Sequence, residues 1–159
     1  MSTQRPLDRI DVGIITALQN DARLSNKELA SRVGLAPSSC LERVRRLRAR
    51  GVLGEAEMRV DPAALGIGLQ AMIAIRLGDQ SRPALERFMA EVPELREVVA
   101  LFNLGGEDDY LLHVMVRDTE HLRNFVLEGL AARPEVRHYQ TSLLFQEIRR
   151  GGVPCYLDV

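Results

Sequence analysis

The chain has 159 residues, of which 46% are hydrophobic and 27% charged, with a formal net charge of -1. This composition is typical of a soluble protein of one ordinary domain or two small ones, and no apolar run approaches the roughly 20 residues that span a bilayer. The two cysteines, Cys40 and Cys155, lie far apart and indicate neither a disulfide framework nor a metal motif. Because the N-terminus lacks an apolar stretch of the signal-peptide kind, we expect a cytoplasmic protein.

The charge is divided unevenly along the chain. Residues 1–60 carry eleven basic and seven acidic side chains, whereas residues 61–159 carry ten basic and fifteen acidic ones. Five of the basic side chains are arginines within positions 43–50. A basic first third and an acidic remainder indicate two modules with different partners, of which the first is suited to a polyanion.

Three helices in close succession are predicted in the first third of the chain. Isoleucine and leucine at i, i+4 and i+8 predict a helix over about 8–20. Residues 25–28 fit an S-x-x-E capping box at the start of a second helix, which Gly34 ends in the left-handed conformation. Pro37 suits the first turn of a third helix. After that helix, the stretch EAEMRVD at 55–61 is a candidate for a short strand or wing.

The third helix has an apolar seam and a polar outer face. On a helical wheel, Leu41, Val44 and Leu47 share one side with Cys40. A tight glycine turn followed by a basic, outward-facing helix is typical of a helix-turn-helix, whose second helix enters the major groove of DNA. Serine is small enough there to let the helix backbone approach the DNA, and arginine can hydrogen-bond to guanine or to phosphates. The predicted DNA-binding residues are Ser38, Ser39, Glu42, Arg43, Arg45, Arg46 and Arg50. Of these, Ser38, Ser39 and either Arg43 or Arg46 are expected to read bases.

Strands and helices alternate in the rest of the chain. The order is β-α-β-β-α-β, the ferredoxin-like unit, so the predicted fold class is α+β with an antiparallel sheet. The strands are predicted at 69–77, 97–104, 109–116 and 136–147, and the helices from Ser81 to Val92 and over about 119–132.

The two middle strands are apolar on both faces. Two helices cover only one face of a four-stranded sheet, and an antiparallel sheet exposed on its other face should alternate apolar and polar residues. The simplest cover for that second face is the same sheet of another copy, which gives an isologous dimer. A dimer also suits a helix-turn-helix, because two helices can meet two half-sites about one turn apart.

Three stretches carry a resemblance to a known family. They are LDRIDVGIITALQNDARLSNKELASRVGLAPSSCLERVRRLRARGVL at 7–53, GEDDYLL at 106–112 and TSLLFQEIRR at 141–150. In these residues the chain resembles the Lrp/AsnC family of bacterial and archaeal transcriptional regulators, in particular its leucine-responsive branch. The resemblance implies an N-terminal winged helix-turn-helix that binds double-stranded DNA. It also implies a C-terminal βαββαβ domain that forms homodimers, which often assemble into octamers.

The resemblance further implies a site for a small-molecule effector, commonly an amino acid bound between dimers. Part of that site is a loop of G-x-x-D form, matched here by residues 106–109, and another part is the start of the last strand. The ammonium group of a bound amino acid would pair with Asp109, and the carboxylate of that amino acid would accept from backbone N–H groups of the loop. Asp108 departs from the bulky residue common in the family, so the acidic loop favours a ligand with extra positive or hydrogen-bonding character, or no effector. The predicted effector-binding residues are Leu104, Gly106, Glu107, Asp108, Asp109 and Thr141.

The resulting prediction is a DNA-binding regulator with no catalytic residues, cofactor, metal or membrane partner. An enzymatic alternative remains, because sirohaem decarboxylases resemble this fold and act on a tetrapyrrole; His113 and His138 are the candidate residues for it. A third hypothesis is an effector-binding module that regulates enzymes by direct contact. The predicted division is a DNA-binding domain over 1–61, a linker over 62–69, an effector-binding and oligomerisation domain over 70–150, and a tail over 151–159.

Overall fold

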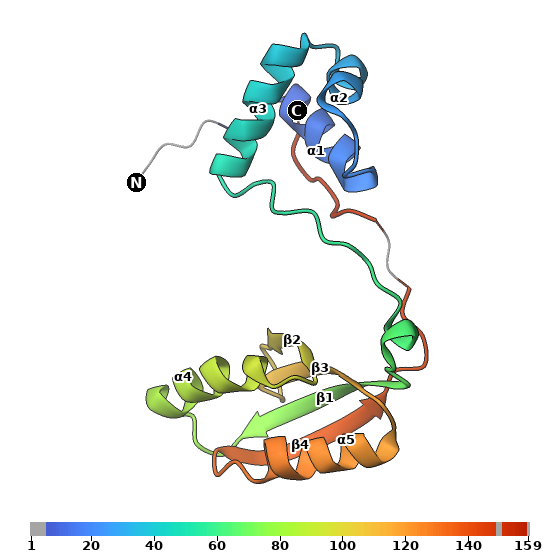
Figure 1. Cartoon of the computed structure of the whole chain (residues 1–159). Coiled ribbons are helices and arrows are strands. Elements are labelled where there is room, and N and C mark those ends of the chain that lie inside the picture. The colour runs from blue at the N-terminus through green and yellow to red at the C-terminus, as the bar shows by residue number, and fades with distance from the viewer. Residues whose placement is uncertain (1–5, 149–150, 159) are drawn as a thin grey trace. The chain divides into compact units, whose positions relative to one another are not determined.

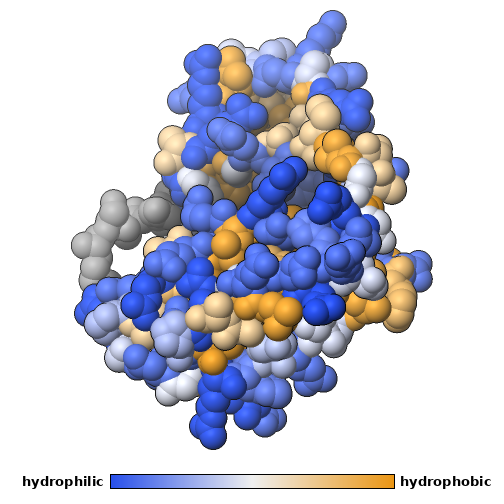
Figure 2. Space-filling model, turned by 60° about the horizontal axis from the view of Figure 1, so that its bottom comes forward, coloured by the Kyte–Doolittle hydropathy of each residue, from blue (hydrophilic) through white to orange (hydrophobic). Residues whose placement is uncertain are grey.

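The computed structural model of the chain describes residues 6–148 and 151–158. The chain forms two compact units (Figure 1). The first comprises the described residues up to Met58 together with those from Ile148 onward, and the second spans Arg59–Glu147. The side of the molecule shown in Figure 2 is mostly hydrophilic, with apolar side chains in small groups. No helix in the described part of the chain is long and apolar enough to cross a membrane.

Three helices form the first unit: α1 (Arg9–Asn20), α2 (Asn26–Val33) and α3 (Pro37–Ala49). The capping box predicted for α2 is confirmed, because the Ser25 side chain accepts from the backbone N–H of Glu28 and the Glu28 carboxylate accepts from the backbone N–H of Ser25. Gly34 ends α2 with a φ of 70°, a left-handed conformation that glycine adopts without strain. Pro37 occupies the first turn of α3, as predicted. This tight connection places α3 directly after α2, as a helix-turn-helix requires.

The apolar seam of α3 packs on the other two helices. Cys40, Val44 and Leu47 are buried, whereas Leu41, expected on the same side, is exposed at its edge. The core of the unit is Ile14, Leu29, Ala30, Cys40, Val44 and Leu47. Burial raises the pKa of the Cys40 thiol, because desolvation disfavours the thiolate.

The two cysteines should therefore differ in reactivity. Cys40 is buried and Cys155 is exposed, and neither forms a disulfide. Since the thiolate is the nucleophile, we expect a reagent such as DTNB to modify one thiol quickly in the native protein and two after denaturation. The released chromophore counts the thiols, and Cys155→Ser is the matched control, which should leave no fast phase. Two fast-reacting thiols in the native protein would contradict the burial of Cys40.

The segment considered as a strand or wing, residues 55–61, forms neither helix nor strand. Its apolar side chains Met58 and Val60 are exposed. A strand is stabilised by hydrogen bonds to a neighbouring strand, and no described segment of the single chain pairs with this one. The expectation of a wing strand is therefore not met within one chain.

The second unit is a βαββαβ fold, as predicted. Its four strands form one sheet in the order β2-β3-β1-β4, and every neighbouring pair is antiparallel. The elements in chain order are the 3-10 turn η1 (Pro62–Leu65), β1 (Leu69–Leu77), α4 (Arg82–Glu91), the 3-10 turn η2 (Val92–Glu94), β2 (Val98–Asn103), β3 (Tyr110–Val116), α5 (Thr119–Phe125), the π-helical η3 (Val126–Ala131) and β4 (Val136–Leu143).

Two elements end differently from the prediction. The helix expected over about 119–132 changes at Val126 into the wider π-helical turns of η3. The last strand stops at Leu143 rather than at residue 147, because its partner strand β1 begins at Leu69 and offers little more backbone to bond. One further hydrogen bond, from the Leu144 N–H to a β1 carbonyl, completes the ladder.

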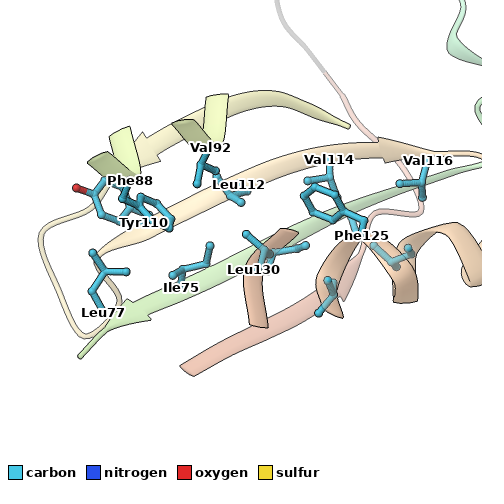
Figure 3. Packing of buried hydrophobic residues seen from close by; sticks show 14 residues of the cluster. Ile75, Leu77, Phe88, Val92, Tyr110, Leu112, Val114, Val116, Phe125 and Leu130 are labelled. Carbon is cyan, nitrogen blue, oxygen red and sulfur yellow. The ribbon is translucent and has the colours of Figure 1, made fainter. Parts of the chain in front are cut away.

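One face of the sheet is covered by the helices and forms the main core. Figure 3 shows side chains of β1 and β3, among them Ile75 and Leu112, directed toward helical residues such as Leu130. The Phe88 and Tyr110 rings pack with their centroids 4.8 Å apart. The spacing of Leu85, Phe88, Met89 and Val92 in the sequence predicts one shared apolar face of this helix. Met89 is nevertheless 52% exposed, while Phe88 is fully buried. The helix therefore presents a narrower apolar stripe to the sheet than its sequence indicates.

A bulge in β2 changes the pattern of its two faces. Val98 pairs with Val114 and Ala100 pairs with His113, so Val99 is an extra residue on β2. The extra residue places both Val98 and Leu101 on the core side, where simple alternation predicts opposite sides. On the second face, the register sets Leu111 between Ala74 of β1 and Phe102 of β2. On this face Ala74, Leu111 and Phe102 form an apolar group, as the sequence indicated, and polar residues such as Gln70 and His113 lie beside it.

Candidate functional site

One stripe of α3 is exposed along the whole helix. Ser38, Glu42 and Arg45 stand at i, i+4 and i+7 and are all exposed, and Ser39 is exposed beside them. At the start of α3 the N-cap is Ala36, which provides no side-chain hydrogen bond to the first turn. Backbone N–H groups there remain available, and the positive end of the helix dipole favours a phosphate oxygen. The stripe and the uncapped end together have the donors that a DNA-reading helix needs.

A neighbouring stripe of α3 behaves differently. One nitrogen of Arg43, Nη1, lies 2.7 Å from Asp8 Oδ2 and 2.8 Å from Asp11 Oδ1. Arg46 Nη2 lies 3.2 Å from the same Asp11 oxygen. Arg50 lies half-buried at the C-cap. Of the predicted DNA-binding arginines, Arg45 is therefore exposed, whereas Arg43 and Arg46 are paired with α1 and its cap.

The paired aspartates were not among the residues singled out from the sequence. Asp8 caps α1 by accepting from the backbone N–H of Asp11 at 2.9 Å, in a capping box that its D-x-x-D spacing could have indicated. The guanidinium of Arg43 lowers the pKa of Asp8, chiefly through the hydrogen bond between them. The two aspartates in turn raise the pKa of Arg43. Both partners are thus held in their charged forms.

The acidic loop between β2 and β3 is tied to β1. The Asp109 carboxylate accepts from the Leu77 backbone N–H at 2.7 Å and from the Gln80 side chain at 3.2 Å. Arg76 Nη2 lies 2.8 Å from Glu107 Oε1 and 3.4 Å from Asp108 Oδ1. The pKa of Arg76 is raised, first by its hydrogen bond to Glu107. Arg76 is a residue of this site that the sequence did not single out.

The remaining effector-site residues are not all brought together. Leu104 is next to Asp109, because its N–H donates to the Asp109 carbonyl at 2.8 Å, and Gly106 is exposed in the same loop. Thr141 is exposed on β4 and pairs with Ile73 of β1. Since β1 and β3 separate β4 from β2, one chain alone does not place Thr141 at the loop.

The two histidines of the enzymatic alternative lie apart. Both are on the second face of the sheet, but His113 is paired with Met72 and His138 with Arg76. His113 is buried and shares a hydrogen bond of 2.9 Å with Gln70, whereas His138 is exposed. Within the described residues no cluster of three or more potential metal ligands occurs. Met72 and Arg76 are four residues apart on β1, so the two histidines are not neighbours on the sheet of one chain.

Comparison with known proteins gives a consistent result for both units. Residues 7–48 match the family model of the AsnC-type helix-turn-helix domain, and residues 70–154 match that of the Lrp/AsnC ligand binding domain. The HTH-type transcriptional regulator AldR of Mycolicibacterium smegmatis is 47% identical over 145 residues, covering 91% of this chain and 85% of that protein. The leucine-responsive regulatory protein of Salmonella typhimurium is 37% identical, with 95% of this chain and 94% of that protein covered. A solved transcriptional regulator from Neisseria meningitidis, in complex with L-Met, has a TM-score of 0.85 at 35% identity and covers 94% of this chain and 97% of its own.

Proposed function

Because the chain belongs to the Lrp/AsnC family of transcriptional regulators, we propose that it binds operator DNA through α3 and answers to a small-molecule effector, with an amino acid as the favoured class. The observation that carries the DNA-binding part is the exposed stripe of α3 next to its uncapped N-terminus. The family supports the effector part, since the Salmonella relative is named for leucine and the Neisseria relative was solved with L-Met.

In this proposal the exposed residues along α3 make different contacts with DNA. The first turn enters the major groove, where Ser38 and Ser39 are small enough to let the backbone approach base edges and phosphates. Glu42, one turn further, can accept from a cytosine amino group. Arg45 supplies an exposed guanidinium for a phosphate.

We further propose that the working form is a homodimer, with octamers as its higher assembly. The support is the second face of the sheet, where Ala74, Leu111 and Phe102 are cross-strand neighbours. Apolar side chains on an exposed face of an antiparallel sheet are stabilised when another surface buries them. A second copy of the same face can bury them by two-fold symmetry. Two copies of α3 would then meet two half-sites of an operator.

The effector site would be completed by another copy of the chain, since Thr141 and the acidic loop lie on different parts of the sheet. Asp109 is turned toward the end of β1, where it accepts from Leu77 and Gln80, whereas the Glu107 side chain is 82% exposed. A ligand ammonium would therefore be met first by Glu107, with Asp108 beside it. Arg76, released from these carboxylates, would be free to bind the ligand carboxylate. The proposed site therefore has both charges that a zwitterion requires.

The test is a pull-down of fragmented genomic DNA with the purified protein at about 150 mM salt, where non-specific attraction is weakened. We expect a few discrete fragments to be enriched, and their recovery to change when a mixture of the twenty amino acids is added. Single amino acids would then identify the effector. No change with any of them would remove the amino-acid class, and no enriched fragment would overturn the proposed DNA binding.

Two variants make the pull-down specific for α3. Arg45→Gln removes an exposed guanidinium from the proposed reading stripe and is expected to reduce recovery strongly. Arg123→Gln makes the same change at an exposed arginine of α5, in the sheet unit, and should leave recovery unchanged. Equal losses in the two variants would point to unspecific electrostatic capture instead of reading by α3.

A further inference from the structure

The arginines of α3 divide into two groups by what they touch. Arg45 has no ion pair with any described residue, whereas Arg43 is held by three short contacts. Its Nη1 lies 2.9 Å and 2.7 Å from the two carboxylate oxygens of Asp8, and 2.8 Å from Asp11 Oδ1. Arg43 was expected among the residues that read bases, so this placement changes its role.

The contact is costly to break, because one of its carboxylates is buried. Asp11 is 1% exposed, and a buried carboxylate needs a cationic partner or several hydrogen bonds. Arg43 and Arg46 provide the cationic partners, with Arg43 the closer of the two. If Arg43 turned outward to a phosphate, Asp11 would keep only longer contacts, to Arg46 at 3.2 Å and to the Asp8 backbone N–H at 3.5 Å. Asp8 would lose the contacts that Arg43 makes to both of its carboxylate oxygens.

The same aspartates also define the start of α1. Asp8 Oδ1 accepts both from the Asp11 backbone N–H, as the helix cap, and from Arg43 of α3. One small cluster therefore fixes the beginning of α1 and the middle of α3 relative to each other. α3 can only read DNA if its exposed stripe points in a defined direction from the three-helix core.

We infer that Arg43 is a positioning residue: held by Asp8 and Asp11, it sets the orientation of α3 on α1 and does not itself contact DNA. The contacts to bases and phosphates are then made by the stripe of Ser38, Glu42 and Arg45. This inference rests on the proposed DNA binding and refines it, since it removes one arginine from the reading surface and assigns it to the scaffold.

The salt dependence of operator binding tests the inference. Each phosphate contact contributes a slope of roughly 0.9 in a plot of log K against log salt concentration. Arg43→Gln is expected to weaken binding about tenfold or more while leaving this slope unchanged. Arg45→Gln on the same helix is expected to lower the slope by roughly 0.9 for each α3 engaged. A slope reduced equally in both variants would show that Arg43 contacts a phosphate and would overturn the inference.

Asp8→Asn keeps the test decisive if Arg43→Gln does not fold. Asparagine caps a helix as well as aspartate does, so this change keeps the α1 cap and removes one of the two negative charges that hold Arg43. Losing a negative charge near DNA should strengthen binding by simple electrostatics, whereas a loosened Arg43 should weaken it by about two- to tenfold. Asp21→Asn, at the other end of α1, is the matched control for charge alone. Tighter binding by Asp8→Asn would overturn the inference.

Rescue by lysine provides a third readout. All three contacts of Arg43 use one nitrogen, and a lysine ammonium can imitate a single nitrogen with several donors. Arg43→Lys should therefore recover most of the affinity that Arg43→Gln loses, and affinity as low as that of Arg43→Gln would argue against positioning through these carboxylates. If the unchanged protein enriches no DNA fragment at all, the proposed function fails first, which separates the two failures.

Discussion

Replacing Phe88 with alanine is expected to destabilise the sheet unit by about 3–5 kcal/mol, the usual cost of emptying a fully buried phenylalanine site. Phe88 has no exposed surface and packs on Tyr110, which is itself buried on the central strand β3. The cavity would lie between α4 and the sheet, where both partners are fixed by secondary structure and can close it only in part. Denaturation by guanidinium, followed by far-UV circular dichroism, measures the loss.

The neighbouring residue on the same helix is the control for this prediction. Met89 is 52% exposed, so Met89→Ala removes a side chain of similar size that is only half withdrawn from water, and it should cost about 1 kcal/mol or less. Similar losses for Phe88→Ala and Met89→Ala would mean that α4 packs on the sheet through a wider stripe. That result would restore the arrangement expected from the spacing of its apolar residues and contradict the structure.

Local signals in the sequence determine most of the fold. Capping residues and glycines mark the helix ends, as at Ser25 and Gly34, and each acts within a few residues of itself. Alternation failed at β2, because the bulge at Val99 depends on how that strand pairs with β3. The strand end at Leu143 likewise depends on where β1 begins. Features set by a neighbouring element are thus the ones that a single segment cannot predict.

The same distinction applies to the candidate sites. Periodicity alone was enough to place Ser38, Glu42 and Arg45 on an exposed stripe of α3. It could not show that Arg43 is bound to Asp11, because that contact depends on how α1 and α3 pack, across 32 positions of sequence. The effector loop is similar, since its acidic residues were visible but their partner on β1 was not.

Replacing Leu111 with arginine is expected to convert the proposed dimer into monomers and to lower operator affinity by about 100-fold or more, because a bivalent protein would bind with one α3 only. Leu111 lies on the second face, with Ala74 and Phe102 as its cross-strand neighbours. A two-fold interface would withdraw the arginine charge from water in both copies, which costs free energy twice. In a monomer the arginine can reach water, so the fold of the sheet unit should survive.

The matched control is Leu127→Arg, which makes the same change at a half-exposed leucine of η3 on the helical side of the unit. Sedimentation equilibrium gives the assembly state and a gel-shift titration the affinity, with circular dichroism to verify folding. If Leu111→Arg stays dimeric, the second face is not the interface. If it is monomeric but binds the operator as before, one α3 is sufficient and dimerisation serves another purpose. The apolar face of the sheet is connected to DNA reading by α3 only if Leu111→Arg loses both dimerisation and operator affinity while Leu127→Arg keeps both.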